Sequence, residues 1–320
     1  MNATFAQDCE KLPDRAPPDG AGAVAVDGGD GGGGGAPGSG PRPASVALTP
    51  DVVIEPGRGL FHLDLKSIWR YRELLYFLVW RDVKVRYKQT VIGALWAILQ
   101  PLLTMAIFAV VFGHFAKIPS DGLPYPVFVY AALLPWVYFA QALQQSATSL
   151  VRNANLISKV YFPRVLLPLA AALTPLVDLF FSFLVLLGLM AWFGLRPTAA
   201  ILALPLLLLP AFMTALAAGL WLAPLQVKYR DVGHTLPFLS QAWMYASPVA
   251  YPLSLVPERF RLWYGLNPMV GVIEGFRSAL LGQGSPDLAP MAVSAAALLA
   301  ILLGGIVYFR RMERTFADVV

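Results

Sequence analysis

A short basic run lies directly before an uncharged apolar stretch in LLYFLVWRDVKVRYKQTVIGALWAILQPLL, residues 74 to 103. The run consists of Arg81, Lys84, Arg86 and Lys88. Cationic side chains at the edge of a bilayer lie level with the lipid phosphates, which they can bind through charge-assisted hydrogen bonds. The same residues also suit a topological anchor that needs no ligand, and the sequence leaves both interpretations open.

Uncharged polar and aromatic side chains recur along one face of three apolar segments. Aromatic rings stack on the C–H faces of a sugar, and amides and hydroxyls exchange hydrogen bonds with its hydroxyl groups. This pattern favours a translocation path for a sugar, although the same residues also suit the packing of helices against one another. The expected path residues are Trp96, Gln100, Thr104, Tyr130, Tyr138, Gln141, Gln145, Ser240, Trp243, Ser247 and Tyr251.

Asp178 is a carboxylate deep inside an apolar segment, within LTPLVDLFFSF. An acid at this depth is a candidate functional residue, and a proton-coupled flippase of lipids or sugars would use one. No second acid and no basic residue shares its segment, and Pro175 frees a backbone carbonyl that would stabilise the protonated form. We therefore expect a structural or gating role for Asp178 and keep the proton-coupled flippase as the alternative.

Catalytic and cofactor chemistry has little support in the sequence. The chain contains no G-x-x-x-x-G-K-[ST] phosphate loop and a single cysteine, Cys9. The three histidines fall in different segments, which makes a metal site improbable. A membrane-bound transferase, a second alternative, would need a cluster of acids or bases that this chain does not offer. We expect no enzyme activity and no cofactor or metal in this chain.

These side chains must be positioned by helices that cross a membrane. Of the 320 residues, 57% are hydrophobic and 13% are charged, and the charges lie between apolar runs long enough to cross a hydrocarbon core of about 30 Å. We predict an all-α membrane protein with six spans, at residues 91–115, 127–150, 165–193, 198–222, 236–252 and 288–309. With both termini inside, fifteen Lys and Arg residues flank the inner ends of these spans and five lie outside, which predicts cytoplasmic termini.

The remaining segments complete the predicted organisation. Residues 1–60 form a disordered cytoplasmic tail, because eleven of the residues from 20 to 40 are Gly. Residues 61–90 form an amphipathic interface helix with Leu75, Leu78 and Val85 on its apolar face. The membrane domain covers 91–310, and 311–320 form a cytoplasmic tail. Within the domain, 250–286 are apolar but interrupted by Pro and Gly, which indicates re-entrant helices on the outer side, the alternative being a loop resting on the outer leaflet.

The segment LVRNANLISKVYFPRVLLP, residues 150 to 168, joins the second and third predicted spans. We predict a short helix here, with Leu156 and Val160 on one face and Asn153, Asn155 and Lys159 on other sides. A short helix at the end of two long spans can act as a rigid lever against a cytoplasmic partner.

Four stretches of this sequence closely resemble one family. They are the 74–103 stretch quoted above, AALLPWVYFAQAL, NANLISKVYFPR and KYRDV. They resemble the membrane-embedded permease subunits of bacterial ABC-type polysaccharide exporters, the O-antigen, capsule and teichoic-acid export family. The similarity covers roughly residues 52 to 315, so only the glycine-rich tail and the last residues lie outside it.

The resemblance implies a homodimer of six-span subunits in the bacterial inner membrane. It implies an interface helix before the first span, a coupling helix between spans two and three, and re-entrant helices after span five. It also implies a separate ATPase subunit that binds ATP and Mg, and a polysaccharide cargo carried on undecaprenyl pyrophosphate or another lipid.

Given this resemblance, we hypothesise roles for two groups of residues in this sequence. The lipid pyrophosphate is expected to enter at Arg81, Lys84, Arg86 and Lys88. The expected contacts that couple the chain to the ATPase are Asp82, Asn153, Asn155, Leu156, Lys159 and Val160.

Overall fold

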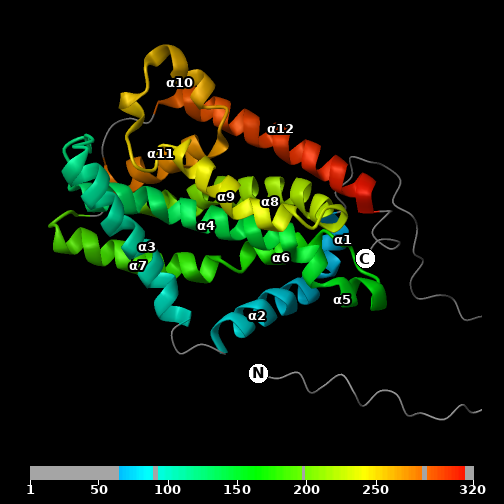
Figure 1. Ribbon diagram of the computed structural model, residues 1–320. Coiled ribbons are helices and arrows are strands. Elements are labelled where there is room, and N and C mark those ends of the chain that lie inside the picture. Colours follow the sequence, from blue (N-terminus) through cyan, green and yellow to red (C-terminus); the bar gives the residue numbers. More distant parts are fainter. Residues whose placement is uncertain (1–64, 89–92, 197–198, 283–286, 314–320) are drawn as a thin grey trace, which may run out of the picture. The chain divides into compact units, whose positions relative to one another are not determined.

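The computed structural model describes residues 65–88, 93–196, 199–282 and 287–313 (Figure 1). The predicted N-terminal tail and most of the predicted C-terminal tail lie outside these residues. The described residues contain helices and connecting turns but no strand, which confirms the all-α class.

Five helical segments are long and apolar enough to cross a membrane. They correspond to predicted spans one to four and six, and the protein is therefore a multi-pass membrane protein. The elements within them are α3 (Gly93–Phe108) with the π-helical η1 (Ala109–Phe115), α4 (Tyr125–Arg152), α6 (Leu166–Leu173) with α7 (Leu176–Trp192), the 3₁₀ turn η2 (Ala199–Ala203) with α8 (Leu204–Lys228), and α12 (Leu288–Glu313).

The third of these segments is broken in its middle. The α6 helix ends at Leu173, and α7 begins at Leu176, directly after Pro175. Proline has no N–H to donate and its ring clashes with the preceding helical turn, so the helix is interrupted there. The break places Asp178 in the first turn of α7.

The predicted fifth span differs from the structure. It corresponds to α9 (Val232–Tyr245), whose 14 residues extend about 21 Å and end before the predicted boundary at residue 252. Pro248 disfavours helical backbone at the residue before it, which explains the early end. Three short elements follow: η3 (Leu253–Leu255), α10 (Glu258–Tyr264) and α11 (Pro268–Leu281).

The predicted interface helix is two helices, α1 (Leu65–Arg70) and α2 (Arg72–Lys88), which are interrupted at Tyr71. Leu78 is buried and Leu75 packs beside it, as predicted for the apolar face. Val85, the third residue predicted for that face, is 62% exposed.

The α4 helix is the centre of the bundle, and it packs against α3, α6, α7, α8, α9 and α11. Its contact with α8 is close, because a Cβ atom added to Gly219 would lie 2.5 Å from the Cβ atom of Ser146. A hydrophobic cluster joins Leu78 of α2 to Leu150, Leu166 and Phe309. The elements around this cluster are α2, α5 (Ala154–Lys159) and the C-terminal ends of α4, α8 and α12, and we call this part of the molecule the basic end.

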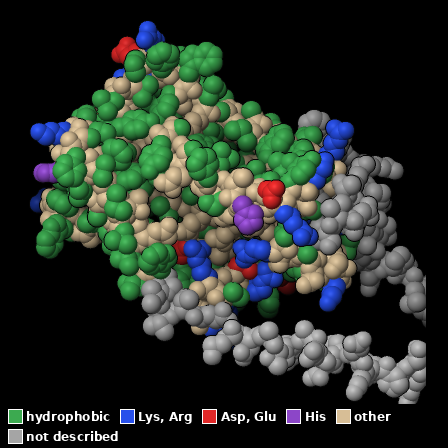
Figure 2. All heavy atoms as spheres, viewed as in Figure 1, with side chains coloured by type: hydrophobic (Ala, Val, Ile, Leu, Met, Phe, Trp, Pro, Cys, Tyr) green, Lys and Arg blue, Asp and Glu red, His purple; other side chains and the backbone are tan. Residues whose placement is uncertain are grey.

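The surface of the molecule separates apolar from charged side chains. Figure 2 shows hydrophobic side chains over most of the visible face, while many of the basic and acidic side chains gather from its lower centre to its lower right, with smaller groups at the top and the left edge. In Figure 1 the C-terminal ends of α4 and α12 and the short helix α5 lie on that side. Many of the charged side chains on this face thus lie toward the end of the molecule where α4 and α12 end.

Candidate functional site

The most prominent polar site joins the last turn of α2 to the middle of the bundle. Arg86 forms an ion pair with Asp178, with 2.7 Å between Nη2 and Oδ2, and donates a hydrogen bond of 3.2 Å to Oε1 of Gln141. The hydroxyl of Tyr87 donates to the other carboxylate oxygen, Oδ1 of Asp178. We call these four residues the Asp178 cluster; they connect α2, α4 and α7.

The break at Pro175 explains why Asp178 can occupy this buried position. Its side chain is only 5% exposed, but it lies in the first turn of α7, where the helix dipole favours a negative charge. Arg86 supplies the opposite charge. Burial, and then the hydrogen bond to Asp178, raises the pKa of the Tyr87 hydroxyl, which therefore stays protonated as a donor.

The other members of the predicted basic run have different surroundings. Arg81 donates to Asp82 and, over 2.8 Å, to Oδ1 of Asn153, so it ties α2 to the junction of α4 and α5. The ammonium group of Lys84 lies over the Trp80 ring, and Lys84 and Lys88 are both exposed. The run therefore divides into two arginines that bind neighbouring helices and two lysines that face outward.

Several predicted path residues are buried inside this chain. Tyr130, Tyr138 and Ser247 have almost no exposed surface. The Tyr138 hydroxyl donates to the Ala172 carbonyl over 3.0 Å, and Ser247 accepts a hydrogen bond from Asn267 over 2.8 Å. These three side chains contact neighbouring parts of the same chain, so within one subunit they do not line an open passage.

Trp243 and Tyr251 take part in the packing of the segment that follows α9. Trp243 packs edge-on against Phe139, and its indole N–H donates to Oδ1 of Asn267 over 3.0 Å. The Tyr251 hydroxyl lies 2.6 Å from that of Tyr264. Both side chains remain partly exposed.

The remaining path residues are more accessible. Trp96 and Gln100 are exposed on α3, and the Thr104 hydroxyl donates to the Gln100 carbonyl. Gln145 of α4 and Ser240 of α9 are partly exposed. Gln141 belongs instead to the Asp178 cluster. The structure therefore does not bring the eleven predicted residues together around one cavity of this chain.

The predicted coupling segment contains α5, a helix of six residues. Leu156 packs on the cluster of the basic end, whereas Asn155, Lys159 and Val160 are exposed. Val160 follows the helix in extended backbone, so it does not continue the face of Leu156 as predicted. Asn153 and Asp82 are both bound to Arg81, and Asp82 is largely buried.

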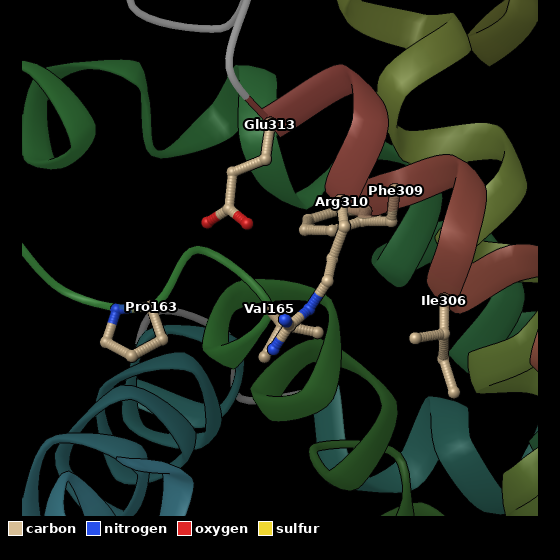
Figure 3. A pocket seen from close by; sticks show the side chains of 6 residues that line it. All are labelled: Pro163, Val165, Ile306, Phe309, Arg310 and Glu313. Carbon is tan, nitrogen blue, oxygen red and sulfur yellow. The ribbon is translucent and has the colours of Figure 1, made fainter. Parts of the chain in front are cut away.

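The end of α12 contacts the segment that follows α5, a feature that the sequence analysis missed. Arg164 donates over 2.6 Å to the carbonyl of Glu313, and its backbone N–H donates to the Glu313 carboxylate. In Figure 3, Arg310 and Glu313 extend from α12 beside Pro163 and Val165. The cavity between them measures about 40 Å³, which is far too small for a sugar.

Arg277 of α11, a buried arginine, was also missed, since the sequence analysis counted it only among the five outer charges. Its guanidinium donates to the carbonyls of Val249 (2.8 Å) and Tyr251 (3.2 Å), pairs with Glu274 and lies 3.8 Å from the centre of the Phe128 ring. We call this arrangement the Arg277 clamp. Burial raises the pKa of the Glu274 carboxyl, and Arg277 opposes that shift. The signal in the sequence that could have identified this site is an arginine within a largely apolar helical segment.

Comparisons with known proteins agree with this architecture. Residues 73–281 match the ABC-2 type transporter membrane family. The chain is 30% identical over 257 residues to the O-antigen export system permease protein RfbA of Myxococcus xanthus, which covers 79% of this chain and 98% of that protein. It is 24% identical over 249 residues to RfbA of Klebsiella pneumoniae, covering 78% and 95%.

A third relative is the polysialic acid transport protein KpsM of Escherichia coli, which is 24% identical over 236 residues, or 73% of this chain and 91% of that protein. These relatives are transport proteins, and they give no support to a proton-coupled flippase that works through Asp178. The matched region contains α2 to α11, and with it both the Asp178 cluster and the Arg277 clamp. The chain belongs to the ABC-2 type transporter family.

Proposed function

We propose that this chain is the transmembrane permease subunit of an ABC transporter that exports a lipid-linked polysaccharide of the O-antigen or capsule type. The single observation that carries the proposal is that the chain matches export permeases over nearly their entire length. The lack of a phosphate loop fits a subunit whose ATP and Mg are bound by a separate ATPase.

The proposed assembly is a homodimer bound to two ATPase subunits in the bacterial inner membrane. We propose that α2 lies at the membrane surface, because Tyr76, Phe77 and Trp80 are exposed beside basic residues. α9 serves as the short fifth of six spans, and α10 and α11 are re-entrant helices on the outer side. Both termini are cytoplasmic, since the basic end then lies inside.

The proposed path for the glycan runs between the two subunits. Trp96 and Gln100 support this, because they are exposed on α3 among apolar neighbours, and an exposed amide is poorly suited to face lipid. Tyr130, Tyr138 and Ser247 would have to leave their present partners to line the path. The lipid pyrophosphate is proposed to arrive at the basic run, where Lys84 and Lys88 are exposed and Arg81 and Arg86 are partly exposed.

The proposed ATPase contact is the surface of α5 and the residues around it. Asn155, Lys159 and Val160 are exposed there, while Leu156 anchors the helix to the bundle. Asn153 and Asp82 do not form this surface; both bind Arg81, which connects the start of α5 to α2. A movement of α5 would be passed on to α2 by this connection.

The test is co-expression with the ATPase encoded beside this chain, followed by purification on a tag that only this chain carries. We expect a stable complex of two copies of each subunit that hydrolyses ATP. The Lys159→Glu variant should retain less ATPase, whereas Arg196→Glu, at the opposite end of the span that contains α7, should retain as much as the wild type. Purification of the chain without any ATPase would contradict the proposal.

A further inference from the structure

The Asp178 cluster contains two partners with unequal access to the surroundings. The side chain of Arg86 is 35% exposed, whereas that of Asp178 is 5% exposed. Arg86 can therefore meet an anion that arrives from outside the bundle, while Asp178 stays where it is. The guanidinium group binds carboxylates and phosphates with the same paired N–H geometry, so the two anions can compete for it.

We propose that Asp178 is a resident counter-anion that holds Arg86 in the absence of cargo, and that the phosphates of the lipid-linked cargo displace it. This inference rests on the proposed function, because it requires an anionic lipid as cargo. Arg86 is then the residue that binds the cargo phosphate, and Asp178 sets the phosphate concentration at which binding begins.

The cluster has a second attachment that would persist during this exchange. Tyr87 donates to Oδ1 of Asp178, while Arg86 pairs with Oδ2. When Arg86 turns away, the carboxylate keeps the Tyr87 hydroxyl and the N-terminal turn of α7 as partners, which limits the cost of leaving it buried. The end of α2 would then stay attached to Asp178 through Tyr87 but no longer through Arg86.

The release of Arg86 from Asp178 would change the position of α2, and α2 would transmit this change to the proposed ATPase contact. Arg81 binds Asn153 at the start of α5 and lies five residues before Arg86, or about 7.5 Å along the same helix. A single helix thus connects the proposed cargo-binding arginine with the proposed coupling segment. The exchange at Asp178 would let the complex adjust ATP hydrolysis to the presence of cargo.

The experiment uses the complete complex with its ATPase in nanodiscs of phosphatidylcholine, and it measures ATP hydrolysis while undecaprenyl pyrophosphate is added. We expect Asp178→Asn to lower the concentration for a half-maximal change in rate by about tenfold, a typical size for coupling between two sites. Arg86→Gln should abolish the response. Arg72→Gln removes an equal charge from an exposed position on the same helix, where the guanidinium lies over Trp69, and should behave as the wild type.

A second variant tests the same exchange in case Asp178→Asn does not fold. Gln141→Leu removes a hydrogen-bond acceptor of Arg86 and leaves every charge in place, so it should lower the half-maximal concentration in the same direction by a smaller factor. An unchanged half-maximal concentration in the assembled Asp178 or Gln141 variant would overturn the exchange. A response retained in Arg86→Gln would overturn it as well.

Three further outcomes distinguish the sources of phosphate and distinguish the exchange from the proposed function. If phosphatidylglycerol shifts the rate as strongly as undecaprenyl pyrophosphate, Arg86 senses phospholipid and the assignment to cargo is overturned. If the wild-type chain forms no ATP-hydrolysing complex, the proposed function fails and the exchange fails with it. If the wild type assembles and responds while the variants show no shift, only the exchange is overturned.

Discussion

The Asp178 cluster and the Arg277 clamp each contain an arginine–carboxylate pair with one buried member, but they are built differently. Arg277 pairs with Glu274 one turn away on the same helix, is 7% exposed, and also binds two backbone carbonyls and an aromatic ring. Arg86 pairs with a residue of a different helix and remains partly exposed. The clamp has no access for a competing anion, whereas the cluster does.

This difference suits the two regions to different roles, one in stability and one in regulation. The Arg277 clamp fixes the turns after α9 to α11, so these short elements form one firm unit with few ways to rearrange. The Asp178 cluster fastens α2 to the bundle through side chains that can change partner. Substitutions in the clamp should therefore affect stability, while substitutions in the Asp178 cluster should affect the regulation of transport.

The largest expected effect comes from Arg277→Met. This change leaves the partly buried Glu274 without its partner, and breaking a pair of which one member is buried should cost about 3 kcal/mol in the free energy of unfolding. Unfolding of the purified chain in mixed micelles would measure it. Arg259→Met, an exposed arginine over Phe260, is the matched control and should change stability little.

The same variant should show a dependence on pH. Without Arg277, burial holds the folded-state pKa of Glu274 above its unfolded value, so stability falls as pH rises from the unfolded pKa through the folded one. The loss should be greater at about pH 8 than at about pH 5. Equal losses at both pH values would show that Glu274 is not the group left unpaired.

A somewhat smaller loss is expected for Asn267→Ala. Asn267 caps α11 by accepting from the Met269 N–H, accepts from Trp243 and donates to Ser247. Loss of a cap and of these hydrogen bonds should cost about 2 kcal/mol in the free energy of unfolding. A loss below that of an exposed surface substitution would indicate that water replaces all of these contacts.

For Asp178→Asn we expect a loss of about 1–2 kcal/mol, because Arg86 is partly exposed and can be solvated after its partner is neutralised. The unfolding assay used for Arg277→Met gives the direct comparison. A loss as large as that of Arg277→Met would remove the distinction between the two regions.

The smallest effect on stability is expected for Arg81→Gln. Arg81 itself is exposed, but its partner Asp82 is largely buried, so the loss of this ion pair should cost about 1 kcal/mol. The connection to Asn153 would nevertheless be lost, so cargo should alter ATP hydrolysis less in the variant than in the wild type. Unfolding and hydrolysis measured on the same preparations test both statements, and an unchanged response to cargo would exclude a coupling role for Arg81.

Much of the fold could be predicted because span-length apolar runs are determined by local composition. The sequence also placed a short helix between spans two and three, and the structure contains α5 there. The end of the fifth predicted span was harder to predict, because apolar residues continue past Tyr245 into a region where Pro248 and Pro252 favour turns.

The candidate sites depended on contacts that no local pattern contains. Asp178 was recognised as unusual, but its partners Arg86 and Tyr87 lie about 90 residues earlier on another helix. Periodicity placed Tyr138 and Gln141 on a polar stripe, but the same spacing serves a lined path and helix packing equally well. Only the structure shows that Tyr138 binds the Ala172 carbonyl and that Gln141 binds Arg86.

The most direct test of the central claim is transport itself. Membrane vesicles containing the complex would be loaded with a labelled polysaccharide on undecaprenyl pyrophosphate at the face that corresponds to the cytoplasm. The label would then be followed to the opposite face with and without ATP. We predict movement only when ATP and both subunits are present. Movement without the ATPase, or no movement in a complex that hydrolyses ATP in response to the lipid, would contradict the assignment as an export permease.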